Sequence, residues 1–472
     1  MAIVASFFRP SLANVISVSA LLSACVPGDP ARGIRGLEAV LSPDVGLVVE
    51  LFWDSQAVGD AWVEFGTSED RSRSTPVTRD DGTHHTARLL GLPPLSTVYY
   101  EVFTDEGDGV VSKRGEIVTD GLPPGLPELS LEVHPGRDVS SEPYLLAAVL
   151  GVECFVLAVD RSGEVLWYRT ITAEQHRKMP VKVAFDDFSS GLVVGNFFMD
   201  FLALVSQESP ASSDALFLDM GGELVDQWDL GVAHHDLVQL PDGSMATLGV
   251  DVRDWYDPER DEQVTVMGDI LVLVEPDGER TELFNTWDWS EPWVHDRFYQ
   301  MSEEYADWTH GNGLSYDSAS DCFLLSLGLL DTILEISRST GEVLREFGPD
   351  GYAVQDGRSF VYQHGPHWTE QGTLLMSSWV GSESRVMAIE YEVDDEAGVL
   401  EQVWSYGENE GFTSMAGGQA LRMDNGNTLI NTGYLGLLVE VSPEGQPVWE
   451  LASSMGHVFT SVSFFEDFYR LD

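Results

Sequence analysis

The sequence predicts an all-β protein in which a small β-sandwich precedes a six-bladed β-propeller. Two observations support this fold class. Short strand-like runs separated by turn residues fill residues 36–120, and a longer hairpin repeat fills residues 136–472. The chain has 472 residues, of which 43% are hydrophobic and 13 are Trp. That content separates it from acidic disordered chains, which lack aromatic residues, and is sufficient for a large folded core.

The first 24 residues predict a signal peptide of the lipoprotein type. One positive charge, at Arg9, precedes an apolar run from Ala13 to Leu22 that is too short to span a membrane stably. The run ends in Leu22-Ser23-Ala24-Cys25, which resembles the lipobox of bacterial lipoproteins. We therefore expect a lipid on Cys25, a linker over residues 25–35, and an extracytoplasmic protein whose only membrane attachment is this anchor. The alternative is a plain signal peptide with a chance cysteine.

Residues 36–120 predict the sandwich, because turn clusters recur about every 8–12 residues between strand-like runs. The clearest piece is Leu89–Val102, in which Pro93-Pro94 is followed by Tyr99-Tyr100. It resembles the corner of fibronectin type III domains, where a Tyr ring packs and its hydroxyl bonds nearby backbone. The Pro-rich segment that follows predicts a linker over residues 121–135.

The propeller is predicted from a repeated hairpin: a strand, a polar turn containing Gly, and a strand that often ends in Trp. Six copies are spaced 47 to 63 residues apart, around Gly163, Gly222, Gly278, Gly341, Gly398 and Gly445. Six hairpins at this period favour six four-stranded blades. The alternative, an elongated β-solenoid, has shorter repeats.

A second repeat places histidines at the starts of three consecutive predicted inner strands. His235 and His364 each lie eight residues before the Gly of the next turn, and His310 begins the segment between them. The first strand of each blade lines the central channel, so we expect these three histidines to converge there. The alternative is three hydrogen-bonded turn residues. A purely structural histidine would recur in all blades, whereas the last blade has Gln419 at this position.

Imidazole can serve as a nucleophile, a general acid or base, or a metal ligand. The histidines lack the HxH and HExxH spacings of metal sites, although a propeller can assemble ligands from distant positions. We predict no metal and no cofactor. The 25 Lys and Arg against 78 Asp and Glu give a net charge of −53, and no basic cluster is visible, which excludes nucleic acid as a partner. A histidine-lined channel mouth is then the place where an anion could bind.

Residues 140–455 resemble the bacterial arylsulfotransferases of the aryl-sulfate-dependent type. The matching segments are His235-Asp236, Asp307–Asn312, Gln363-His364, Asp424–Ile430 and Pro443–Glu450. The resemblance implies a secreted or periplasmic six-bladed propeller behind a small N-terminal β domain. It also implies a ping-pong reaction, in which an aryl sulfate passes its sulfuryl group to a histidine and then to a phenol.

By position, the resemblance implies that His364 is the nucleophile. His235 and His310 would bind sulfuryl oxygens or protonate the leaving oxygen, with Asn312 donating from the same loop. The family usually carries an Arg in the strand that follows, but this sequence has Ser326-Leu327-Gly328 there. His367 or Arg385 could take its place. The residues predicted to contact the substrate are Asn312, His367, His234 and Trp308.

Other features are weaker candidates. Trp287, Trp289, Trp293 and Trp308 flank a long loop that could stack an aromatic substrate or simply pack. The acidic residues from Asp251 to Asp261 predict a solvated surface rather than a calcium loop. Cys154 and Cys322 lie in apolar runs, which predicts two buried free thiols.

Two alternative functions remain open at this point. The missing Arg favours a non-catalytic propeller that binds a ligand or a protein at the surface. The same histidines could instead serve a metal-dependent propeller hydrolase or lyase. The sequence does not predict an oligomeric state.

Overall fold

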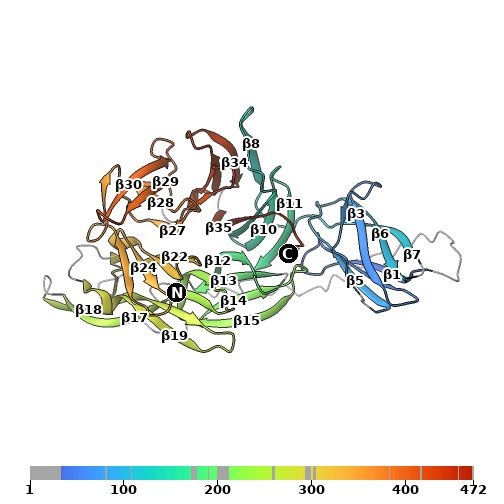
Figure 1. Ribbon diagram of the computed structural model, residues 1–472, viewed down its shortest axis with the longest axis horizontal. Helices are drawn as coiled ribbons and strands as arrows, with labels where there is room; N and C mark the ends of the chain where they lie inside the picture. The colour runs from blue at the N-terminus through green and yellow to red at the C-terminus, as the bar shows by residue number, and fades with distance from the viewer. Residues whose placement is uncertain are drawn as a thin grey trace, which may run out of the picture.

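The computed structural model describes residues 33–79, 82–107, 109–171, 178–189, 191–198, 212–257, 261–292, 299–300, 305–381, 383–414, 417–454 and 457–469. The expected signal peptide, Cys25 and Trp293 lie outside these residues. Within them the protein consists almost entirely of β-sheets, which confirms the all-β fold class (Figure 1). None of the described helices combines the length and the apolar character needed to cross a membrane.

The N-terminal region is a sandwich of two antiparallel sheets. One sheet has the order β1-β2-β5, with β1 Arg35–Leu41, β2 Val49–Asp54 and β5 His84–Leu89. The other has the order β4-β3-β6-β7, with β4 Arg73–Ser74, β3 Asp60–Gly66, β6 Thr97–Asp105 and β7 Val110–Val118. Buried and exposed residues alternate along β2 and β3, and their inward side chains form one core with Trp53 and Phe65. The specific likeness to fibronectin type III domains stays a prediction.

Six further sheets follow among the described residues. The first has the order β11-β10-β9-β35, with β9 Tyr144–Leu150, β10 Cys154–Asp160, β11 Val165–Ile171 and β35 Val458–Phe465. The second contains β12 Lys178–Phe185, β13 Leu192–Phe198, β14 Ser213–Leu218 and β15 Leu224–Gly231. The third contains β16 Ala233–Gln239, β17 Met245–Asp257, β18 Glu262–Val274, β19 Arg280–Asn285, β20 Tyr299–Gln300 and β21 Tyr305–Asp307, beside helix α2 Thr286–Trp289.

The fourth sheet contains β22 Gly311–Asp317, β23 Cys322–Leu327, β24 Thr332–Ser337 and β25 Val343–Phe347, with the short helix η2 Gly328–Leu330. The fifth contains β26 Ala353–Asp356, β27 His364–Trp368, β28 Leu374–Val380, β29 Glu383–Asp394 and β30 Val399–Tyr406. The sixth contains β31 Gln419–Arg422, β32 Thr428–Asn431, β33 Leu437–Val441 and β34 Pro447–Ser453, with η3 Gly433–Leu435 and an added strand, β8 Leu129–Val133.

The innermost strands of neighbouring sheets contact one another in the order β35, β12, β16, β22, β27 and β31, and β32 returns to β35 (Figure 1). The sheets therefore form a closed ring, as in a propeller, although a count of six blades stays a prediction. Two strand pairings close the ring: β35 joins β9 in the first sheet, and β8 joins β34 in the last. Leu129–Val133 belongs to the segment expected to be a linker, so the connection between the domains is shorter than residues 121–135.

Three of the tryptophans that end the repeated hairpins link neighbouring sheets. The indole N–H of Trp167 donates to the carbonyl of Met220 at 2.9 Å, and that of Trp404 donates to Pro443 at 3.0 Å. Trp449 donates to the carbonyl of Arg161 at 3.0 Å, across the closure of the ring. In each case the acceptor lies in the hairpin turn of the adjacent sheet. The Gly-turn and Trp repeat thus describes an inter-sheet contact as well as a hairpin.

The sandwich packs against the propeller at the end remote from the histidines. The Ser42 hydroxyl donates to the carbonyl of Gly221 at 2.6 Å, and Arg88 pairs with Asp219 at 2.6 Å. Both acceptors lie in the β14–β15 turn, which the strand pairings place at the end of β12. The end of β12 lies beside the end of β16, because Asp187 N–H donates to the Gln239 side chain. His235 lies near the start of β16, away from this interface.

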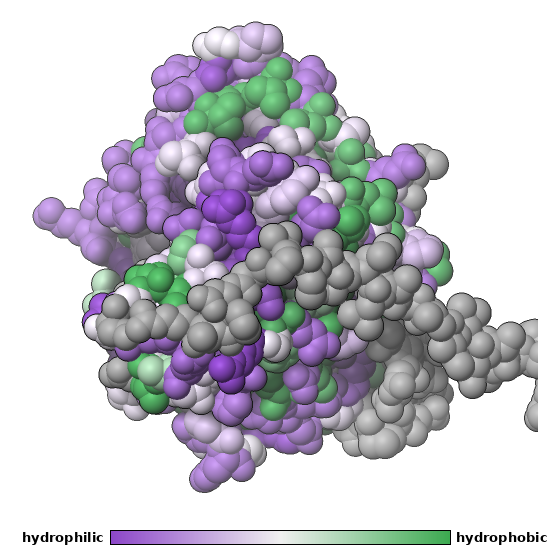
Figure 2. All heavy atoms as spheres, turned by 90° about the vertical axis from the view of Figure 1, so that its right-hand side faces the viewer, coloured by the Kyte–Doolittle hydropathy of each residue, from purple (hydrophilic) through white to green (hydrophobic). Residues whose placement is uncertain are grey.

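The exposed surface and the cysteines agree with the sequence analysis. Figure 2 shows one face of the molecule covered mostly by hydrophilic side chains, with hydrophobic ones in separate patches. Such a surface suits a chain with a net charge of −53. Cys154 and Cys322 are buried free thiols, which confirms that prediction.

The inter-sheet tryptophans carry a testable contribution to stability. Trp167→Phe keeps most of the buried ring but leaves the Met220 carbonyl without its donor, which is expected to lower the free energy of unfolding by about 1–3 kcal/mol. Trp228 is the matched control, because its indole bonds the carboxylate of exposed Asp226 two residues away. Trp228→Phe is expected to change stability by less than about 0.5 kcal/mol. Equal effects of the two substitutions in urea unfolding would contradict the inter-sheet role.

Candidate active site

The structure brings together the three histidines predicted to converge. His235 is the third residue of β16, His310 directly precedes β22, and His364 begins β27. The ring centroids of His235 and His310 are 5.1 Å apart. The rings of His310 and His364 each lie 5.6 Å from the ring of Tyr362, which sequence reasoning missed.

The backbone at this cluster departs from regular strand geometry. His235, His310 and Tyr362 have φ values of +60°, +51° and +48°, in the left-handed region that non-glycine residues rarely adopt. The pairing of each inner strand with its neighbour also shifts register beside these residues. Such conformations cost about 1–3 kcal/mol each, and they persist where the surrounding structure holds them. Here they aim side chains from three sheets at one another.

The ring of His364 is held as a neutral imidazole. Its Nδ1 lies 3.2 Å from the carbonyl oxygen of Tyr362, which can only accept, so Nδ1 carries the proton and Nε2 keeps its lone pair. Burial, together with the charge of His310, lowers the pKa of His364 to about 4. The amide nitrogen of Asn312 lies 3.3 Å from Nε2.

His310 is held in the opposite electrostatic state. Its Nδ1 lies 2.7 Å from a carboxylate oxygen of Asp307, which also accepts the His310 backbone N–H at 3.0 Å. Burial acts to lower the pKa of His310, but the hydrogen bond and charge of Asp307, together with Asp269, raise it above its usual value. The site therefore pairs a neutral imidazole at His364 with one that readily carries a positive charge.

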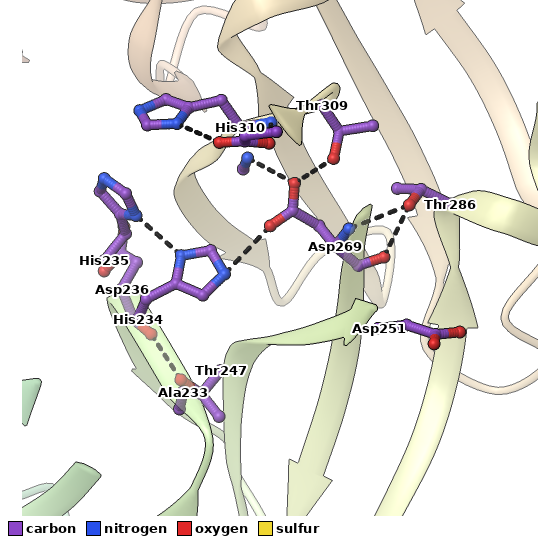
Figure 3. Close-up of polar contacts among 12 residues, drawn as sticks. Ala233, His234, His235, Asp236, Thr247, Asp251, Asp269, Thr286, Thr309 and His310 are labelled. Atoms are coloured by element: carbon purple, nitrogen blue, oxygen red, sulfur yellow. Dashed lines mark hydrogen bonds and ion pairs between the residues drawn. The ribbon is translucent and has the colours of Figure 1, made fainter. Parts of the chain in front are cut away.

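His234 does not face a substrate, although sequence reasoning expected it to. It is 1% exposed and lies behind His235, with the two Nδ1 atoms 2.7 Å apart (Figure 3). Its Nε2 lies 3.0 Å from the carboxylate of Asp269. Burial is the main cause that lowers the pKa of His235 well below its usual value, and the charges of His234, His310 and His364 add to it.

Asp269 is a residue beside the cluster that sequence reasoning missed. It lies on β18 and is 1% exposed, and its carboxylate accepts the Gly311 N–H at 2.6 Å and the Thr309 hydroxyl (Figure 3). Burial would raise the pKa of Asp269, but His234 and these donors lower it, so the residue is ionised. Its one signal in the sequence is an acidic residue within the mainly apolar run Val264–Val274.

Two other predicted contact residues lie elsewhere. Trp308 is fully buried in the core of the third and fourth sheets, so it leaves no surface for a substrate, and the packing interpretation of this tryptophan is the correct one. His367 bonds the Gly365 carbonyl through Nδ1 at 3.3 Å, and burial lowers its pKa. Its charged neighbours are Lys182, Arg422 and Glu390, none of which belongs to the His235–His310–His364 cluster.

Gly328, at the position where the family usually carries Arg, lies directly beside the side chain of Asn312. A Cβ atom on Gly328 would lie 2.5 Å from the amide nitrogen of Asn312, so a side chain there would point at this amide. The glycine leaves Asn312 room beside His364. Arg385, considered as a substitute, donates to the Glu408 carbonyl at 2.9 Å.

Within the residues that the structure describes, no three His, Cys, Asp or Glu side chains form a group that could hold a metal ion. The geometry therefore gives no support to the metal-dependent alternative. The histidines are instead bound to carboxylates, to an amide and to one another.

The fold and this cluster together define a β-propeller with a histidine site between three of its sheets. The sequence profile described as arylsulfotransferase (ASST) matches residues 139–365 and 368–459, so the chain belongs to the arylsulfotransferase family. No functionally curated protein matches the chain.

Among solved structures, the chain resembles the periplasmic gluconolactonase PpgL of Pseudomonas aeruginosa, with a TM-score of 0.41, 14% identity, and coverage of 69% of this chain and 99% of that one. It also resembles a streptogramin B lyase, with a TM-score of 0.36, 9% identity, and coverage of 69% and 98%. A luciferin-regenerating enzyme matches with a TM-score of 0.34, 12% identity, and coverage of 70% and 97%.

The opposite pKa shifts in the cluster can be measured directly. In protein labelled with ¹⁵N-histidine, His364 is expected to titrate near pH 4 and His310 above its usual range. Asp307→Asn removes the charge that raises the pKa of His310, so the His310 titration should move to lower pH. Assignments come from His364→Gln and His310→Gln. Titration of both rings near pH 6.5 would contradict the assigned states.

Proposed function

We propose that this protein is an arylsulfotransferase that passes a sulfuryl group from an aryl sulfate to a phenol through a sulfohistidine at His364. The observation that carries the proposal is the pairing of a buried neutral His364, whose Nε2 keeps its lone pair, and a cation-prone His310 beside it. Membership of the arylsulfotransferase family supports the same activity.

In the donor half-reaction, Nε2 of His364 attacks sulfur and the bond from sulfur to the phenolic oxygen breaks. The electron pair of that bond leaves with the phenolate, which then takes a proton from a neighbouring imidazole. Positive charge on His310 and the Asn312 amide N–H would stabilise the negative charge on the sulfuryl oxygens. The acceptor half-reaction is the reverse, with a second phenol attacking the sulfohistidine.

A second candidate, a propeller that binds an aryl anion without turnover, is favoured by one observation. Gly328 supplies no side chain where the family usually carries Arg, and a planar guanidinium is a strong bidentate partner for an oxyanion. The same assay separates the two candidates, because this one requires binding of an aryl sulfate with no release of phenol.

The assay combines purified protein, 4-nitrophenyl sulfate and phenol. The wild-type protein is expected to release 4-nitrophenol and form phenyl sulfate, and His364→Ala is expected to lower kcat by about 10³-fold or more, because no other group forms the covalent intermediate. His84→Ala is the control, since this histidine is exposed on the sandwich. Intact mass measurement should detect one sulfuryl group on the wild-type and His84→Ala proteins and none on His364→Ala. Unchanged turnover in His364→Ala would rule out its role as nucleophile.

We also propose that the protein is held outside the cytoplasm by a lipid on Cys25. Expression of the full chain in a bacterial host should give a membrane-bound product that incorporates radiolabelled palmitate. Cys25→Ser is expected to abolish the label and to release the protein from the membrane fraction, because the thiol is the attachment point. Equal labelling of both proteins would contradict the lipobox interpretation.

A further inference from the structure

We propose that His234 and Asp269 form a proton relay behind His235, so that His235 gives the proton to the leaving phenolate and later takes it from the acceptor phenol. His310 then serves as the cation beside the sulfuryl group. This inference rests on the proposed function, and it assigns separate roles to two histidines that the family resemblance left interchangeable.

One hydrogen bond and one ion-pair contact constrain most of the protons in this group. The Nδ1 atoms of His234 and His235 are 2.7 Å apart, a distance that requires one proton between two nitrogen lone pairs. Nε2 of His234 lies 3.0 Å from the Asp269 carboxylate, so it carries a proton as well. Because Nδ1 of His235 faces His234, we assign the exchange of a proton with the substrate to the other ring nitrogen, Nε2.

These constraints leave two states that differ by one proton. In the first, both imidazoles are neutral: His235 donates from Nδ1 to His234, and Nε2 of His235 holds a lone pair. In the second, His234 carries two protons and is a cation paired with Asp269, and it donates from Nδ1 to His235, whose own proton is then on Nε2. His235 is neutral in both states, yet it changes from a proton acceptor to a proton donor.

The surroundings explain why the charge belongs on His234. The charged groups that face His235 are His234, His310 and His364, which all oppose a positive charge on it. The charged group that faces His234 on its other side is Asp269, which Gly311 and Thr309 hold in its ionised form. A buried cation requires such a counter-ion, because an unpaired charge in a protein interior costs several kcal/mol.

The proposed relay accounts for each proton that moves during the transfer reaction. As the sulfur–oxygen bond breaks, the phenolate takes the proton from Nε2 of His235, which receives the Nδ1 proton of His234. Phenol leaves, His364 carries the sulfuryl group, and His234 is neutral beside ionised Asp269. The acceptor phenol reverses each step, so one group serves both half-reactions, as microscopic reversibility requires. General acid–base catalysis of this kind contributes about 10²–10⁴-fold.

The first test compares His234→Gln with His234→Ala. A glutamine amide can still bond His235 and Asp269, but it cannot accept a second proton. If His234 relays a proton, both variants are expected to lower kcat for phenyl sulfate by about 10²-fold or more, with little change in KM. If His234 only orients His235, glutamine should restore near wild-type turnover, and that result would overturn the proposal.

A second readout is the dependence of the kcat loss on the leaving group, which a structural defect would not change. Phenolate is a stronger base than 4-nitrophenolate and depends more on proton donation, so the loss should be larger for phenyl sulfate than for 4-nitrophenyl sulfate. Asp269→Asn is expected to show the same pattern, since the asparagine cannot balance a charged His234. Equal losses for both sulfates would argue against the relay.

Asp251→Asn is the matched control. Asp251 pairs in register with Gly268, next to Asp269, and its side chain lies apart from the labelled histidines (Figure 3). Its carboxylate accepts hydrogen bonds from Arg253 and Asn285. This variant is expected to retain wild-type kcat with both sulfates.

Formation of sulfohistidine separates failure of the relay from failure of the proposed function. If the wild-type protein forms no sulfohistidine with 4-nitrophenyl sulfate, the proposed function fails and the relay fails with it. If the wild-type protein forms sulfohistidine, and the His234 variants turn over both sulfates as fast as the wild type, only the relay is overturned.

Discussion

The pairing of β35 with β9 closes the ring of sheets in which the histidine cluster lies. This pairing joins residues Val458–Phe465 to Tyr144–Leu150 across more than 300 residues of sequence, and so turns a row of sheets into a ring. The closing strand is bonded to the next sheet as well, because the Val183 N–H donates to the Ser461 hydroxyl at 3.1 Å. Loop-closure entropy opposes such a distant contact only weakly, as it grows with the logarithm of loop length.

Within the ring, one buried carboxylate sets the geometry of the site. Asp269 extends from β18 to His234 on β16 and to the N–H of Gly311 at the start of β22. Its Oδ2 accepts from Gly311 and Thr309, and its Oδ1 lies 3.0 Å from His234. Removing these neighbours would leave a buried charge uncompensated. The left-handed backbone of His235 and His310 is held between these bonds. The contacts that compensate the charge of Asp269 therefore also hold the strained backbone of these two histidines.

The sequence predicted the features that repeat and missed those that do not. The Gly-turn and Trp period identified the hairpins, and the spacing of His235 and His364 from their turns identified the cluster, because both follow from strand geometry. His234 and His235 show the limit of this reasoning. Neighbouring residues of a strand face opposite sides, and a register shift decides which side is the channel. Asp269 and Tyr362 reach the cluster from another strand and another loop, and no local pattern connects them to it.

The charge balance of the inner strands bears on the proposed proton transfer. The described inner strands β12, β16, β22, β27, β31 and β35 carry three Lys or Arg residues, and each is paired with a carboxylate: Lys178 with Asp214, Lys182 with Asp236, and Arg422 with Glu390. These permanent cations are thus neutralised. Gly328, at the position where the family usually carries Arg, has no side chain that could supply another. In a protein with a net charge of −53, the imidazoles are then the groups of the cluster that could supply positive charge to the proposed aryl sulfate. Asp307 and Asp269 are the groups that keep positive charge on them, so two acidic residues make the site attractive to an anion.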